Sequence, residues 1–134
     1  MMPEQNPLVD QLIELAKQHE EIAALWLYGS RARGDHYSGS DYDIAVAFTN
    51  WIPEALERRL RPELLAMTWQ EALELPDGQL SVVDLATCPV PLGWSILSEG
   101  KLLLDRHPQV RMTHESRILS RWELDYSHRA RRYG

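Results

Sequence analysis

The sequence has little cysteine, no long uninterrupted apolar run and no surplus of positive charge. Cys88 is the single cysteine, so no disulfide can form within the chain, which suits a reducing compartment. Asp10 and Glu14 interrupt the N-terminal apolar stretch, which argues against a signal peptide and a membrane span there. We therefore expect a soluble cytoplasmic protein that does not associate with membranes.

Basic residues are scarce in most of the chain. Residues 1–110 carry 8 Lys and Arg against 17 Asp and Glu, a net charge of -9, whereas residues 111–134 carry 6 against 3, a net charge of +3. Proteins that bind nucleic acid need a surplus of Lys and Arg for their phosphate contacts. The composition therefore argues against direct nucleic-acid binding, and the basic C-terminal segment remains available to an acidic partner.

Several familiar nucleotide and metal motifs are missing too. Gly29 and Gly34 have the spacing of the two P-loop glycines, but Asp35 stands where that loop requires lysine. The chain contains no Cys-x-x-Cys and no His-Glu-x-x-His, and its five histidines are scattered. Neither a P-loop nor a structural zinc site is expected.

The length predicts one domain, because 134 residues are too few for two independent cores. Pro62 predicts that the helical stretch from residue 53 to 75 is kinked or divided into two helices. The fold class expected is α/β (α+β), with a small mixed β-sheet of about four to five strands flanked by helices and a C-terminal helical tail. Strands are predicted over 22–28, 41–49, 80–87 and 101–105, and helices over 7–21, 53–75, 91–100 and 108–133.

A Gly-Ser pair at the end of the first predicted strand is followed by two carboxylates on the next. Gly29 has no Cβ and lets phosphate oxygens approach the backbone, while Ser30 adds a hydroxyl at the start of a short helix. Asp41 and Asp43 are two residues apart on a strand, so their side chains share one face. At roughly 6 to 7 Å they repel by ~2.5 kcal/mol. A divalent cation bound with a nucleoside triphosphate would remove this repulsion.

Asp84 is a candidate third carboxylate. It lies among apolar residues of the third predicted strand, where an unpaired charge is costly to bury. If that strand lies beside the pair, three carboxylates converge as in two-metal phosphoryl or nucleotidyl transfer. The alternative is that Asp84 pairs with an arginine.

The Gly-Ser pair or the Asp-x-Asp pair alone could easily occur by chance, but the two at this spacing could not. A bare Asp-x-Asp is expected about half a time in a chain of this composition, whereas a Gly-Ser twelve residues upstream makes the combination rare, about one in several hundred sequences. The alternatives are that Gly29 and Ser30 form a plain turn and that Asp41 is a turn residue.

These residues resemble the signature of the DNA polymerase beta-like nucleotidyltransferase superfamily, Gly-Ser-x10-Asp-x-Asp. The resemblance covers about residues 8–106, which would form the catalytic part of a single nucleotidyltransferase domain (1–134), followed by a helical tail over about 108–134. It implies ATP as substrate and two Mg²⁺ ions as cofactors. Asp41, Asp43 and Asp84 would be catalytic and metal-binding, and the residues that contact the nucleotide would be Gly29, Ser30, Arg33 and Ser40.

Within that superfamily, the short chain and the run Ala32-Arg33-Gly34 resemble the MNT-domain antitoxins paired with HEPN-domain toxin ribonucleases. The resemblance implies an enzyme that moves AMP from ATP to a tyrosine hydroxyl of a cognate HEPN toxin, bound in a hetero-oligomer, and thereby silences it. Arg31 or Arg33 could stabilise phosphate charge, or either could be a surface residue. Two alternatives remain open: a small-molecule nucleotidyltransferase of the aminoglycoside type, and a non-catalytic antitoxin that acts by occlusion.

Overall fold

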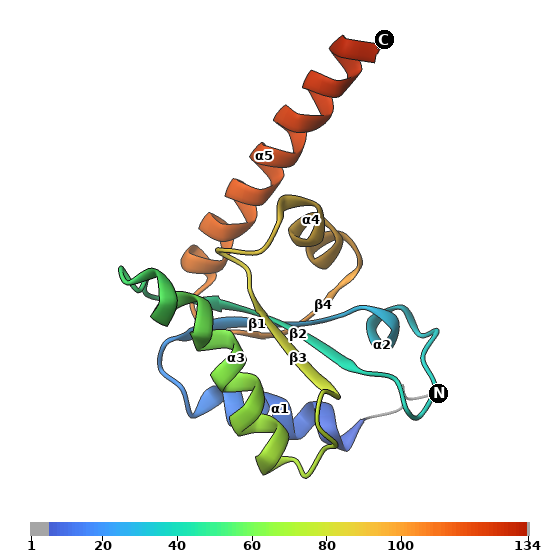
Figure 1. Ribbon diagram of the computed structural model, residues 1–134, viewed down its shortest axis with the longest axis vertical. Helices are drawn as coiled ribbons and strands as arrows, with labels where there is room; N and C mark the ends of the chain where they lie inside the picture. The colour runs from blue at the N-terminus through green and yellow to red at the C-terminus, as the bar shows by residue number, and fades with distance from the viewer. Residues whose placement is uncertain (1–5, 134) are drawn as a thin grey trace.

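The computed structural model describes residues 6–133, with side chains described for residues 6–126 (Figure 1). Within that part the chain forms five helices and four strands. None of these helices is long and apolar enough to span a bilayer. In chain order the elements are α1 Pro7–Lys17, β1 Ile22–Tyr28, α2 Ser30–Arg33, β2 Tyr42–Phe48, α3 Ala55–Ala72, β3 Leu80–Asp84, α4 Val90–Glu99, β4 Lys101–Asp105 and α5 Pro108–Tyr133.

The four strands form one mixed sheet in the order β3-β2-β1-β4. β1 runs antiparallel to both β2 and β4, whereas β2 and β3 are parallel and are joined by the crossover helix α3. The predicted fold class, a small mixed sheet flanked by helices with a C-terminal helix, is confirmed.

Helices cover both faces of the sheet (Figure 1). On one face Leu12 of α1 and Trp69 of α3 pack against Ile44 and Val46 of β2, and all four side chains are buried. On the other face the alanines of β2 pack beneath Ile96 of α4 and Ile118 of α5. Alternate residues of β2 thus enter two separate cores, as its period-two pattern predicts. Asp43 belongs to the α4–α5 face.

Two helices differ from the sequence prediction. α1 begins where Asn6 accepts a hydrogen bond from the Leu8 backbone N–H, and it ends at Lys17, four residues short of the predicted end. α3 is a single helix that continues through Pro62 and ends at Ala72, so the stretch is not divided into two helices, which was one of the two alternatives predicted for it. The Pro62 side chain is buried, and this packing compensates for the backbone hydrogen bond that proline cannot donate.

The C-terminal helix α5 packs on the body through its first half and then extends away from it (Figure 1). Trp122 of α5 stacks on Trp94 of α4 with ring centroids 5.0 Å apart and planes 3° from parallel. Beyond this contact Leu124 and Tyr126 are exposed. The predicted helical tail is therefore present, and Gly134 at its end lies outside the described residues.

Candidate active site

The turn from β1 into α2 places Gly29 directly against Asp43. Gly29 has φ 73 and ψ -156, a backbone conformation that side chains with a Cβ rarely adopt. A Cβ at this position would clash with the Asp43 Oδ2 atom. The predicted Gly-Ser turn and the predicted carboxylate pair therefore lie together, although they come from different elements.

Asp41 and Asp43 form an uncompensated pair of carboxylates. Asp41 is exposed just before β2, Asp43 is half-buried, and no ion pair joins either to a basic side chain within residues 6–126. Burial and the charge of Asp41 raise the pKa of Asp43, and the nearby Arg33 partly opposes this. A carboxylate pair that repels itself beside an open glycine turn fits a divalent cation carrying phosphates.

The structure does not bring Asp84 to this pair. In the parallel register of β2 and β3, Asp43 lies beside Ser81, whereas Asp84 lies beside Val46, three residues further along the strand. Three residues correspond to about 10 Å and to the opposite face of the sheet. The sequence-based placement of Asp84 as the third carboxylate is therefore corrected.

Asp84 instead belongs to the face covered by α3. Its side chain is 1% exposed, its Oδ1 accepts a hydrogen bond of 2.9 Å from the Ala86 backbone N–H, and its Oδ2 lies 4.0 Å from Arg61 Nη2. Burial raises the pKa of Asp84, while that N–H and the Arg61 guanidinium lower it. The structure therefore shows the alternative given above for Asp84, an ion pair with an arginine, here Arg61.

Arg31 holds the loop that carries the carboxylates. Its side chain is buried, its Nε and Nη2 donate to the Ser40 carbonyl at 3.1 and 2.9 Å, and Nη2 also donates to the Ser38 carbonyl at 3.2 Å. The guanidinium also lies 3.8 Å above the Tyr42 ring centroid. These contacts fasten the start of α2 to the residues just before Asp41, so Arg31 positions the site.

Arg31→Ala is expected to lower the free energy of unfolding by about 2 to 3 kcal/mol, because three charge-assisted hydrogen bonds to the Ser38 and Ser40 carbonyls are lost. Arg33→Ala is the matched control, because Arg33 is exposed on the same short helix. Its effect is expected to stay within about 0.5 kcal/mol. Urea unfolding of both variants measures the difference, and equal effects would contradict the assignment.

Arg33 and Ser40, both predicted to contact the nucleotide, differ in how far their side chains are exposed. Arg33 is about half exposed, and its guanidinium forms ion pairs with Asp35 at 3.3 Å and with Glu99 at 3.6 Å. Ser40 is buried, and its Oγ accepts a hydrogen bond of 3.0 Å from the Tyr37 backbone N–H. The structure thus gives the Ser40 hydroxyl a part in holding the loop.

Tyr28 is a site residue that sequence reasoning missed. It is the last residue of β1 and pairs directly with Asp43, so Tyr28, Asp43 and Ser81 form a row across three strands. Burial, with the nearby charge of Asp43, raises the pKa of Tyr28 to about 12. The phenol therefore stays protonated at neutral pH beside the carboxylate. Its position immediately before Gly29 was the available signal.

Residues 10–109 match the family model described as "Polymerase beta, Nucleotidyltransferase". No curated protein matches the sequence. Three solved structures share the fold at 19 to 20% sequence identity.

The first of these is a toxin–antitoxin complex with AMP-PNP, with a TM-score of 0.72, 20% identity and coverage of 91% of this chain and 92% of that chain. The second is the MntA-HepT toxin–antitoxin complex, with a TM-score of 0.67, 20% identity and coverage of 94% and 93%. The third is a tri-AMPylated Shewanella oneidensis HEPN toxin in complex with MNT antitoxin, with a TM-score of 0.66, 19% identity and coverage of 92% and 91%.

Proposed function

The chain belongs to the polymerase beta nucleotidyltransferase family, and from this premise we propose that it transfers AMP from ATP to a tyrosine hydroxyl of a HEPN-type toxin, which it neutralises as an antitoxin. The observation that carries the proposal is the contact between Gly29 and the carboxylate of Asp43. The acceptor is inferred from the solved toxin–antitoxin complexes that share this fold, because one of them contains a tri-AMPylated HEPN toxin bound to an MNT antitoxin.

The residues have separate parts in this proposal. Asp41 and Asp43 would hold Mg²⁺, which neutralises the paired carboxylates and the triphosphate when bound. Gly29 lets the phosphates approach the backbone, the Ser30 hydroxyl donates to them, and the half-exposed guanidinium of Arg33 adds positive charge at the edge. The proposal leaves out Ser40, whose Oγ accepts a hydrogen bond from the Tyr37 N–H, and Asp84, whose carboxylate faces Arg61.

The reaction is an in-line displacement. The tyrosine oxygen forms a bond to the α-phosphorus, the bond from that phosphorus to the β-phosphate oxygen breaks, and pyrophosphate leaves with the electron pair. The phenolic proton passes to solvent or to a neighbouring carboxylate. The chain's own contribution is to orient the triphosphate against Asp41 and Asp43, so that the acceptor meets the α-phosphorus in line.

The experiment that tests the function uses α-labelled ATP, Mg²⁺ and the partner toxin. Label on the toxin is expected with the wild-type protein, and none is expected when Mg²⁺ is chelated. Label on a small molecule in the absence of any partner would favour the small-molecule alternative. Neutralisation without any label would favour occlusion.

We also propose one domain, with a catalytic part over about residues 8–106 and a tail over 108–134 that docks the partner. The exposed end of α5 beyond the Trp94–Trp122 stack supports this division. A cytoplasmic location completes the proposal, and the single half-buried Cys88 is consistent with it.

Ser81→Asp is expected to lower the Mg²⁺ concentration at half-maximal rate by about tenfold, because it adds a third carboxylate beside Asp43 on the same face. Ser81→Asn has the same shape without the charge and should leave that concentration unchanged. The initial rate of AMP transfer measured against Mg²⁺ concentration compares the two variants. If both gave the wild-type curve, Ser81 would not adjoin the metal.

A further inference from the structure

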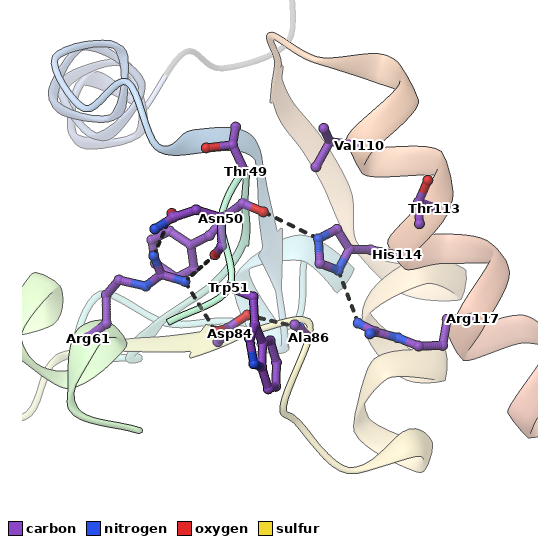
Figure 2. A pocket seen from close by; sticks show the side chains of 11 residues that line it. Thr49, Asn50, Trp51, Arg61, Asp84, Ala86, Val110, Thr113, His114 and Arg117 are labelled. Carbon is purple, nitrogen blue, oxygen red and sulfur yellow. Dashed lines mark hydrogen bonds and ion pairs between the residues drawn. The ribbon is translucent and has the colours of Figure 1, made fainter. Parts of the chain in front are cut away.

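A pocket with polar walls lies at the opposite end of the sheet from the carboxylate pair. It occupies about 450 Å³ where β2 and β3 end, between the first half of α3 and α5 (Figure 2). Five residues of β2 separate it from Asp43, which corresponds to ~17 Å. We call it the carboxyl-end pocket. Its lining consists of Phe48, Thr49, Asn50, Trp51, Arg61, Asp84, Ala86, Val110, Thr113, His114 and Arg117.

The topology accounts for a crevice at this place. β2 and β3 are adjacent parallel strands, yet the chain leaves β2 toward α3 on one face and leaves β3 toward α4 on the other (Figure 1). Crevices outside the carboxyl ends of parallel strands whose connections diverge in this way are where open α/β sheets bind ligands. The volume also lies in the range of small-molecule sites, about 300 to 1,000 Å³.

The walls of the pocket carry two guanidinium groups on opposite sides (Figure 2). Arg117 is exposed on α5 and donates to His114 Nδ1 at 3.2 Å, and His114 Nε2 lies 3.3 Å from the Phe48 carbonyl. Burial lowers the pKa of His114, so the neutral ring accepts from Arg117 and donates to that carbonyl. His114 thereby fixes the Arg117 guanidinium, which has no carboxylate partner within residues 6–126.

The opposite wall holds polar groups that are not fully satisfied. Arg61 donates to the side chain and the carbonyl of Asn50 at 2.8 and 2.9 Å, but its buried Nε has no hydrogen-bond partner among the described residues. Asp84 Oδ2 lies 4.0 Å from Arg61 Nη2, too far for a hydrogen bond. Buried polar groups normally have partners, so this wall is suited to a ligand that supplies them.

The remaining surface is mostly apolar and includes an indole at the rim. Trp51 is 55% exposed, and the Arg58 guanidinium lies 4.1 Å from its ring centroid and braces it. A matching ligand would therefore offer acceptors to the arginines, a donor to Asp84 and a flat apolar ring to Trp51. Inorganic phosphate offers only the first of these, and a nucleoside only the last two.

We propose that the carboxyl-end pocket binds a mononucleotide, with its phosphate at Arg117, a ribose hydroxyl or amino group at Asp84 and its base against Trp51. The site is separate from the transfer site and does not depend on the proposed reaction. The walls carry the guanidinium groups of Arg61 and Arg117 against the single carboxylate of Asp84, which leaves a surplus of positive charge. Such a surplus attracts phosphate.

The test is calorimetric titration of the full-length Asp41→Asn, Asp43→Asn variant with AMP in the presence of a chelator, which disables the transfer site. Binding is expected, and Arg117→Ala in that background should weaken it at least about tenfold, because one charge-assisted contact is removed. Arg121→Ala is the matched control, an exposed arginine one turn further along α5 and outside the pocket. Adenosine and inorganic phosphate should each bind at least about tenfold more weakly than AMP.

Three outcomes would overturn the proposal. The first is no heat of binding with millimolar AMP. The second is an equal affinity for AMP in the Arg117→Ala and Arg121→Ala proteins, which would place the nucleotide elsewhere. The third is an affinity for inorganic phosphate equal to that for AMP, which would make the pocket a simple anion site. Circular dichroism of each variant establishes that the fold is retained.

Discussion

Replacing both Asp41 and Asp43 by Asn is expected to lower AMP transfer at least about 10³-fold, because the protein then loses both of the carboxylates that we propose as ligands of the cation. The initial rate with α-labelled ATP and saturating Mg²⁺ measures the loss. Asp35→Asn is the matched control, since Asp35 is an exposed carboxylate in the loop between Gly29 and Asp41. A double variant that kept more than about a tenth of the wild-type rate would contradict the assignment.

The Asp43→Asn part of this substitution should not destabilise the fold. Burial and Asp41 raise the pKa of Asp43 above its ordinary value of 3.8, so folding favours the neutral form of this carboxyl. Ionisation therefore costs stability as the pH rises above 3.8. Asp43→Asn is expected to raise the free energy of unfolding of the metal-free protein at pH 7, and the gain should vanish near pH 3. Loss of activity together with undiminished stability separates a functional role from a structural one.

Gly29→Ala is expected to lower transfer about 100-fold, because the new Cβ would push Asp43 Oδ2 out of place and misplacement of about 1 Å has an effect of this size. The φ of +73 adds backbone strain of about 1 to 3 kcal/mol, which thermal unfolding would report.

Gly34→Ala separates the effect of the clash with Asp43 from the effect of backbone strain. Gly34 also has a positive φ, +84, but nothing lies within 4 Å of a Cβ added there. This variant is expected to lose stability by about 1 to 2 kcal/mol and to keep most of its transfer activity. If the two alanine variants lost activity equally, backbone strain, and not the approach of Asp43 to Gly29, would be the explanation.

The sequence predicted the parts of the site that local geometry determines. A Gly-Ser at the end of a buried strand specifies a turn, and the alternation of β2 places Asp41 and Asp43 on one face whatever the partner strands are. Both features appear in the structure with Asp43 against Gly29. The apolar periodicity also predicted a small mixed sheet flanked by helices, whereas the strand order β3-β2-β1-β4 comes from the structure alone.

Asp84 was misplaced because its neighbours depend on strand register, which the pattern of β3 alone does not give. A shift of one residue exchanges the faces of a strand. The sequence of β3 nevertheless contained an indication of the correct face. Asp84 is two and four residues from Val82 and Leu80, so it shares their face of the strand, and both of these are buried under α3. An aspartate in phase with core residues is more readily explained by a buried partner, here Arg61, than by a metal on the opposite face.

The role of Arg31 could not be read from the sequence for a different reason. The loop from Gly34 to Ser40 has no periodic pattern, so nothing indicates that its carbonyls at Ser38 and Ser40 turn toward α2. The sequence does not indicate the carboxyl-end pocket either, because Arg61, Asp84 and Arg117 come together from three elements far apart in the sequence.

The most direct test of the central claim is the intact mass of the HEPN-type partner after co-expression with this protein. With the wild-type chain the partner is expected to gain the mass of one or more adenylyl groups, and fragmentation should place them on tyrosine. With the Asp41→Asn, Asp43→Asn variant at equal expression the partner should stay unmodified and toxic. An unmodified partner that is nevertheless neutralised by both proteins would contradict the account.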